Sequence, residues 1–224
     1  MKIGTDGVLL GAWAEIAQAP NILDIGTGTG VLALMAAQRN PNAQITAIDI
    51  EEQAYQQASE NILMSPWKDR IAVHHQSIQD YSKQYKAAPF HSIISNPPFF
   101  DIKASTFIGN EARRLARQTT ELTFTNLLEA AYSLLGETGN FSLVLPMQEG
   151  NTLVALAQTM GFHLKRLTTV IPRVAKKPNR LLIELVKYNC TTQHSTLTIR
   201  NSGQQYHDYT EEYLYLHKEF YLFI

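Results

Sequence analysis

The stretch Asp24-Ile25-Gly26-Thr27-Gly28-Thr29-Gly30 decides the fold of this 224-residue chain. It follows the apolar run 21–25, which predicts a buried strand, and it precedes the apolar helical pattern 31–38. Glycines at alternate positions allow a tight turn and let a ligand approach the backbone closely. In doubly wound α/β sheets, ligands bind at such a loop, beside the N-terminus of the following helix. The spacing is G-x-G-x-G rather than the G-x-G-x-x-G of dinucleotide-binding folds, which argues against a nicotinamide or flavin cofactor.

Outward from this loop, apolar strand-like runs alternate with helical patterns, which is typical of βαβ units and a parallel sheet. An amphipathic helix is predicted over 7–18, with Asp6 as its cap. Seven strands are predicted, with helices between the first six: 21–25, 44–48, 70–74, 90–95, 141–145, 164–171 and 181–187. The last two are joined by a short basic loop and are expected to pair antiparallel at the sheet edge. We therefore expect one Rossmann-like α/β domain over 1–224, with a mostly parallel seven-stranded sheet flanked by helices.

Two acidic residues indicate what kind of ligand the glycine loop holds. Asp49 follows the second predicted strand, where its carboxylate can accept hydrogen bonds from both hydroxyls of a ribose. Asp24 opens the glycine loop, and a carboxylate there suits an amine-bearing or cationic ligand better than a pyrophosphate. S-adenosylmethionine carries a sulfonium, an ammonium and no phosphate. We expect this cofactor to be bound by Asp24, Asp49 and the glycines Gly26, Gly28 and Gly30.

The tetrapeptide Asn96-Pro97-Pro98-Phe99 ends the fourth predicted strand, which neighbours the first strand in such a sheet. An aromatic or amide amino group is a poor nucleophile because its lone pair is delocalised. The Asn96 side-chain oxygen and the Pro97 carbonyl can accept hydrogen bonds from that group and localise the lone pair. Prolines stiffen the backbone, and Phe99 can stack on a planar substrate. We expect these four residues to hold the acceptor nitrogen in line for methyl transfer.

Composition and charge exclude several classes. There is one cysteine, Cys190, so an internal disulfide or a cysteine-rich zinc site is excluded, and the scattered histidines indicate no metal site. No apolar run approaches the length of a membrane span, and the N-terminal residues do not read as a signal peptide. We therefore expect a cytoplasmic protein without membrane association, and a monomer.

Basic residues gather in two regions of a chain whose net charge is −1. No acidic residue stands between Glu149 and Glu184, where six basic residues lie. A basic face on a neutral protein favours a polyanionic partner, although a solvated surface explains such a pattern equally well. The candidate RNA contacts are Lys103, Arg113, Arg114, Arg117, Arg173, Lys176, Lys177 and Arg180.

The glycine loop, Asp49 and the Asn96–Phe99 tetrapeptide resemble class I amino-nitrogen methyltransferases. The segment from Gly4 to Trp13, with Ser65-Pro66-Trp67 and the C-terminal Phe220-Tyr221-Leu222-Phe223, resembles bacterial valine-tRNA adenine-N6 methyltransferases. That resemblance implies methylation of the adenosine immediately 3′ of the anticodon, adenosine 37. It also implies that Thr5 and Asp6 lie near the cofactor. Family members usually carry a few tens of residues before this segment, and often a tyrosine where Phe99 stands.

Three alternatives remain open at this point. A glutamine-amide methyltransferase acting on a translation release factor would use the same tetrapeptide, but those enzymes carry an additional N-terminal helical domain. A nicotinamide oxidoreductase is disfavoured by the glycine spacing. A non-catalytic RNA-binding relative of the fold is disfavoured by the presence of Asp24, Gly26, Asp49 and Asn96 together.

Overall fold

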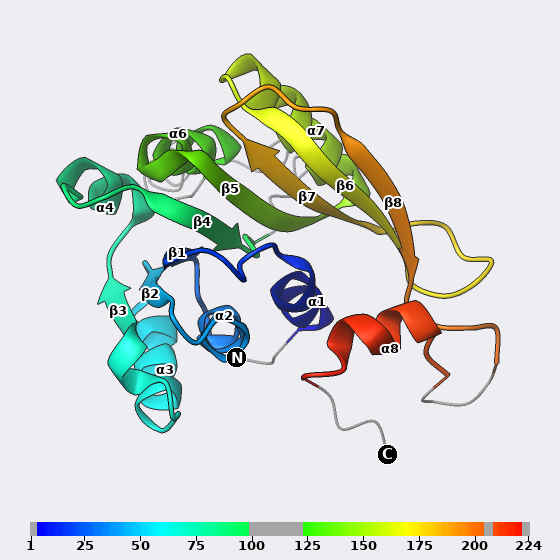
Figure 1. Cartoon of the computed structure of the whole chain (residues 1–224), viewed down its shortest axis with the longest axis horizontal. Coiled ribbons are helices and arrows are strands. Elements are labelled where there is room, and N and C mark those ends of the chain that lie inside the picture. The colour runs from blue at the N-terminus through cyan, green and yellow to red at the C-terminus, as the bar shows by residue number, and fades with distance from the viewer. Residues whose placement is uncertain (1–3, 99–122, 204–207, 221–224) are drawn as a thin grey trace, which may run out of the picture.

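The computed structural model describes residues 4–98, 123–203 and 208–220. Helices and strands alternate along most of this chain, as predicted (Figure 1). The helices are α1 Thr5–Trp13, α2 Val31–Arg39, α3 Glu52–Leu63, the 3₁₀ turn η1 Lys68–Arg70, α4 Ile78–Gln84, α6 Phe124–Leu134, α7 Met147–Thr159 and α8 Glu211–His217. The strands are β1 Asn21–Ile25, β2 Gln44–Asp49, β3 Ile71–His75, β4 Phe90–Ser95, β5 Leu135–Pro146, β6 His163–Ile171, β7 Arg180–Val186 and β8 Gln193–Thr198.

The strands form one sheet in the order β3-β2-β1-β4-β5-β7-β6-β8. Strand β7 pairs antiparallel with both β5 and β6, whereas all other neighbours pair in parallel. Strands β1 and β4 lie side by side and parallel, and the order of strands along the sheet reverses its direction between them. This is the switch point at which doubly wound sheets bind ligands.

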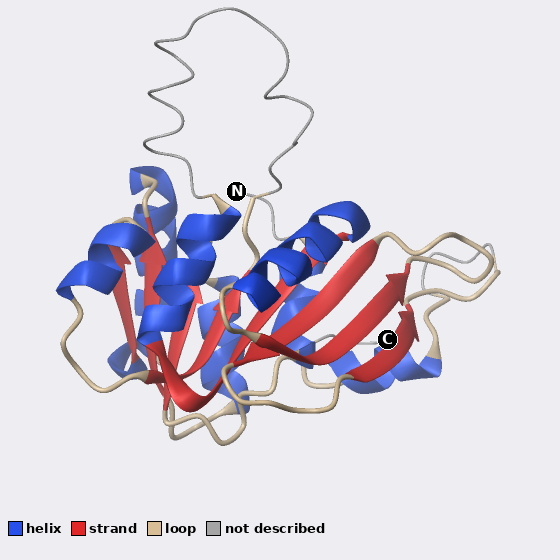
Figure 2. Ribbon diagram, turned by 90° about the horizontal axis from the view of Figure 1, so that it is seen from above, coloured by secondary structure: helices blue, strands red, loops and turns tan. Residues whose placement is uncertain are grey.

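Helices cover both faces of this sheet (Figure 2). Alternate residues of β1 enter different cores, because successive side chains of a strand point to opposite faces. Leu23 packs with residues of α4, α6 and α7, while Ile22 packs with residues of α1, α2 and α8. Both cores are closed, with Leu23 and Ile22 at 0% exposure, so the central strands form a rigid platform. None of the described helices is long and apolar enough to cross a bilayer.

The expected fold class is correct, but the predicted count of seven strands is wrong. The eighth strand, β8, pairs in parallel with β6 and forms the sheet edge. Its sequence QHSTLT is mostly polar, and four of its six residues are exposed, so it carries no apolar alternation. The β6–β7 pair is antiparallel as predicted, but it does not form the edge, because β8 covers β6.

The predicted helix over 7–18 is shorter and begins earlier in the structure. Gly4 is the residue before α1, and no side chain caps this helix, so the prediction that Asp6 caps it is wrong. The Asp6 carboxylate instead accepts a hydrogen bond from Arg180, far along the sequence. The C-terminal carbonyls of α1 are bound by a guanidinium of α2, since Arg39 donates to Gly11 and Ala14 at 2.8 and 2.7 Å.

Candidate functional site

Three loops meet at the carboxyl edge of the sheet because the strands before them are in register. Ile25 of β1 pairs with Ile48 of β2 on one side and with Ser95 of β4 on the other. The next residues, Gly26, Asp49 and Asn96, therefore emerge together. The Ser95 hydroxyl donates to the Ile25 carbonyl at 2.8 Å, and the Gly26 amide donates to the Ile48 carbonyl at 2.9 Å. One side-chain and one backbone hydrogen bond thus join the ends of these strands where the loops begin.

The glycine loop adopts a backbone that other residues would find strained. Gly26, Gly28 and Gly30 have φ values of 70°, 59° and 81°, in the left-handed region that favours glycine. A Cβ added at Gly26 would meet no atom within 4 Å, so the loop faces open space on this side. The last glycine precedes α2, whose N-terminus lies beside that space.

Asp24 is fully buried, with one carboxylate oxygen satisfied and the other open. Its Oδ2 accepts a 2.6 Å hydrogen bond from the Thr27 hydroxyl. Its Oδ1 accepts no hydrogen bond of normal geometry from any described residue. Burial raises the pKa of the Asp24 carboxyl to about 7, and hydrogen bonding from the Thr27 hydroxyl and the Ala33 backbone amide opposes that rise. A buried acceptor without a donor fits a ligand that brings its own, such as an ammonium group.

Asp49 is held by two backbone amides in a half-buried position. Its Oδ2 accepts from the Gly28 amide at 2.8 Å, and its Oδ1 accepts from the Glu51 amide at 3.0 Å. A carboxylate has about four acceptor positions, so two remain for hydroxyl donors. The bond from Gly28 also joins the carboxylate directly to the glycine loop.

The start of the tetrapeptide lies beside α1. Asn96 is half-buried, Pro97 is buried and Pro98 is exposed, while Phe99 falls outside the described residues. A Cβ added at Gly7 would lie 3.6 Å from the Asn96 Nδ2 atom, so the first turn of α1 lies close to the Asn96 side chain. The structure therefore brings α1, the glycine loop and Asn96 to one edge of the sheet.

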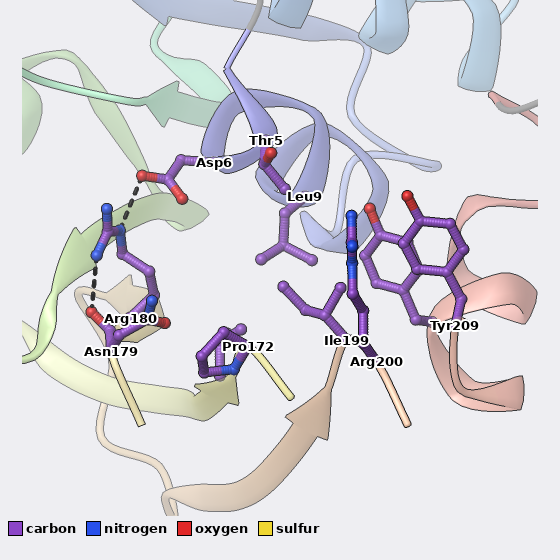
Figure 3. A pocket seen from close by; sticks show the side chains of 11 residues that line it. Thr5, Asp6, Leu9, Pro172, Asn179, Arg180, Ile199, Arg200 and Tyr209 are labelled. Atoms are coloured by element: carbon purple, nitrogen blue, oxygen red, sulfur yellow. Dashed lines mark hydrogen bonds and ion pairs between the residues drawn. The ribbon is translucent and has the colours of Figure 1, made fainter. Parts of the chain in front are cut away.

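Thr5 and Asp6 precede Gly7 in the same turn of α1, and the Asp6 carboxylate pairs with a residue of β7. Figure 3 shows this carboxylate facing Arg180 at the start of β7, where Arg180 Nε donates to Asp6 Oδ2 at 2.8 Å. Strand β7 is antiparallel to its neighbours, so its first residue lies at the edge where the parallel strands end. That topology brings Arg180 to Asp6. Neither this ion pair nor the hydrogen bond from Thr27 to Asp24 was indicated by the sequence patterns.

The basic residues predicted to contact RNA divide into three groups. Lys176 and Lys177 are exposed in the loop between β6 and β7. Arg173 donates to the Gly203 carbonyl at 2.8 Å, and Arg180 donates to Asp6, so both guanidinium groups already bind other parts of the chain. Four candidates lie outside the described residues: Lys103, Arg113, Arg114 and Arg117.

Two other basic residues of this region have structural roles. Lys165 Nζ lies 3.0 Å from Glu184 Oε1, and Arg166 pairs with the other oxygen of the same buried carboxylate. In the described parts of the chain, no cluster of histidine, cysteine or acidic side chains is suited to hold a metal ion.

Comparisons with known proteins agree with this geometry. The family model described as "Methyltransferase small domain" matches residues 4–169. A protein of Vibrio parahaemolyticus named tRNA1(Val) (adenine(37)-N6)-methyltransferase is 44% identical over 222 residues, covering 99% of this chain and 89% of its own length. A protein of Escherichia coli with the same name is 42% identical, covering 100% of this chain and 89% of its own length.

Solved structures show the same fold at lower identity. A structure from Agrobacterium tumefaciens, described as a predicted O-methyltransferase, has a TM-score of 0.73 at 20% identity, covering 96% of both chains. The glycopeptide N-methyltransferase MtfA, solved with S-adenosylmethionine, has a TM-score of 0.57 at 14% identity, covering 84% of this chain and 90% of its own. By its family match and its near-full-length identity to these relatives, the chain belongs to the tRNA1(Val) (adenine(37)-N6)-methyltransferase family.

Proposed function

We propose that this chain transfers the methyl group of S-adenosylmethionine to N6 of adenine in tRNA, at adenosine 37 of valine tRNA. The observation that carries the proposal is the Oδ1 atom of buried Asp24, which accepts no hydrogen bond of normal geometry from the described residues and lies at the same sheet edge as Asn96 and Pro97. The Asp24 side of this edge suits the ammonium group of the cofactor. The Asn96 side suits the amino group that receives the methyl. The names of the relatives supply the tRNA substrate. A tRNA substrate also implies a cytoplasmic enzyme.

The described residues fit the proposed cofactor. Asp24 offers a buried acceptor for the ammonium, Gly26 leaves room beside the backbone, and Asp49 retains acceptor positions for ribose hydroxyls. Gly28 and Gly30 would shape the same loop. When bound, S-adenosylmethionine supplies an electrophilic methyl group on a sulfonium, which is a highly activated leaving group.

Asn96 and Pro97 would position the acceptor nitrogen. The Asn96 side-chain oxygen and the Pro97 carbonyl accept hydrogen bonds from the adenine amino group and localise its lone pair for attack. Asn96 lies beside the first turn of α1 at Gly7, and the fixed φ angles of Pro97 and Pro98 restrict the backbone that carries these acceptors. The extra proton on the methylated nitrogen leaves to water, so no strong base is required. The adenine must be unpaired or flipped out of its stack to reach Asn96.

A methyl-transfer assay with isotopically labelled cofactor tests the proposal. The chain is incubated in parallel with valine tRNA transcript, with the same transcript carrying guanosine at position 37, with a translation release factor and with DNA. We expect label in the first transcript, recovered as N6-methyladenosine after digestion, and none in the guanosine control. Label in the release factor alone would replace adenine with a glutamine amide as acceptor, and would refute the tRNA proposal.

A further inference from the structure

A second cavity lies beside the proposed methyl-transfer site and shares α1 with it. It has a volume of about 330 Å³ and lies among α1, the ends of β6 and β7, and the segment from β8 to α8. Asp24, Asp49 and Asn96 do not line it. Thr5 and Asp6 do, and the next residue, Gly7, lies beside Asn96. The first turn of α1 therefore separates this cavity from the acceptor site.

The walls of the cavity combine guanidinium groups with aromatic rings. Figure 3 shows Arg180 on one side, and Arg200 with Tyr209 on another. The guanidinium carbon of Arg200 lies 5.2 Å from the centre of the Tyr209 ring, and Tyr209 stacks on Tyr213 at 5.0 Å. The lining includes two guanidinium groups, of Arg180 and Arg200, and one carboxylate, of Asp6, so its charge is net positive. Flat aromatic and guanidinium surfaces stack on nucleobases, and guanidinium groups also bind phosphate.

The chain holds these walls together by backbone contacts. Arg200 forms an isolated antiparallel bridge with Tyr209, and its carbonyl accepts a 2.9 Å hydrogen bond from the Val174 amide. The ion pair between Arg180 and Asp6 connects β7 to α1 on the opposite side. Leu9, Pro172 and Ile199 supply an apolar surface between the two sides. These contacts fix the shape of the cavity, and its volume of about 330 Å³ lies at the lower end of the range for small-molecule sites, about 300–1,000 Å³.

We propose that this cavity binds an unpaired nucleotide of the substrate tRNA next to the adenosine that is methylated. The proposal rests on the proposed function and adds a second contact site for the same RNA. An adenine held at Asn96 is out of its stack, so an adjacent nucleotide loses a stacking partner as well. Arg200 and Tyr209 would provide that nucleotide with a new stacking surface and a positive charge.

The test combines protein variants with altered RNA. Valine tRNA is assembled with an abasic nucleotide on the 5′ or on the 3′ side of the target adenosine, and binding is measured at fixed salt. We expect one of these two tRNAs to bind the unaltered protein about tenfold more weakly, the scale of one lost base stack. Arg200→Ala should weaken binding of intact tRNA by a similar factor. The same variant should lose no further affinity on the sensitive abasic tRNA, because the contact is already missing.

Matched controls separate a nucleotide contact from a structural effect. Lys86→Ala removes an exposed cation before β4, at the opposite edge of the sheet, and Tyr215→Ala removes a ring of α8 that is 73% exposed. Both should bind tRNA as the unaltered protein does. Tyr209→Ala serves as a second variant, and S-adenosylmethionine affinity and melting temperature report whether each variant is folded.

The outcomes distinguish this proposal from the proposed function. If the unaltered protein methylates tRNA but neither abasic nucleotide weakens binding, the nucleotide site is refuted and the proposed function stands; this result needs no variant to fold. If the losses of tRNA affinity caused by Arg200→Ala and by the abasic nucleotide are fully additive, the nucleotide does not bind in this cavity, and the proposal is refuted. If the unaltered protein transfers no methyl group to intact tRNA, both proposals fail.

Discussion

The glycine loop after β1 and the basic loop between β6 and β7 lie at the same edge of the sheet but are built in opposite ways. The glycine loop surrounds a fully buried carboxylate, and Asp24, Thr27 and Asp49 bind within or beside it over short sequence distances. The basic loop exposes Lys176 and Lys177, and Arg180, the first residue of β7 after it, binds Asp6, 174 residues away in the sequence. On the proposed function, the first loop binds the small cofactor and the second presents positive charge to the tRNA.

The largest effect is expected at Asn96, between these two loops. Asn96→Ala should lower kcat by about 10²–10³-fold or more, because it removes a preorganised acceptor that acts at the reacting nitrogen. The affinity for S-adenosylmethionine should stay within about threefold, since Asp24 and Asp49 are unchanged. Single-turnover kinetics and calorimetry would measure the two quantities. Asn42→Ala, at an exposed position before β2, is the control; near-normal turnover of Asn96→Ala would refute the mechanism.

Substitution of Asp24 tests whether cofactor binding at the glycine loop depends on a buried negative charge. Asp24→Asn should weaken cofactor binding by about 10- to 100-fold, because a charge-assisted hydrogen bond is lost. Burial raises the pKa of this carboxyl to about 7, so the unaltered protein should bind the cofactor about five- to tenfold more weakly at pH 6 than at pH 7.5. Calorimetry at both pH values would show this difference. The variant should show no such pH dependence; an identical dependence in both proteins would exclude Asp24 as its source.

The same raised pKa predicts how the ligand-free protein responds to pH. A carboxyl whose folded pKa exceeds its unfolded value of 3.8 stabilises the fold below that value, and the contribution is lost as pH rises through about 7. The melting temperature of the unaltered protein should therefore fall relative to that of Asp24→Asn between pH 4 and pH 7.5. Each kcal/mol corresponds to about 2–4 °C for a domain of this size. Parallel melting curves across this range would contradict the assignment.

The smallest effects are expected in the basic loop. Lys177→Glu should weaken tRNA binding several-fold and reduce its salt dependence by about one unit of slope, without changing the melting temperature. Arg173→Glu should weaken binding similarly but also destabilise the fold by about 1 kcal/mol, because the bond to the Gly203 carbonyl is lost. Salt titrations of binding and thermal melts measure both. Lys86→Glu, at the amino ends of the parallel strands, is the control. If Lys177→Glu changed tRNA affinity and its salt dependence no more than this control did, the basic loop would not contact RNA.

Much of the sheet could be predicted because its central strands are buried on both faces. Stretches rich in apolar residues, such as NILDI at 21–25 and FHSIIS at 90–95, are almost entirely buried, and the positions of Asp24, Asp49 and Asn96 follow from where such strands end. The polar edge strand β8 escaped prediction because it contacts only one neighbour and needs no apolar face. The helix over 7–18 was predicted too long because its apolar residues continue past Trp13, where the chain leaves the helix.

The sequence by itself determined the α/β class, the glycine loop and the tetrapeptide, since each depends on residues adjacent in the chain whose conformational limits are local. Only the tertiary structure decided that Asp6 pairs with Arg180 and that Arg200 and Tyr209 line a cavity beside α1. Those contacts join segments separated by as many as 174 residues. They arise because the reversed strand β7 returns its first residue to the edge where the parallel strands end, and no local pattern specifies that meeting.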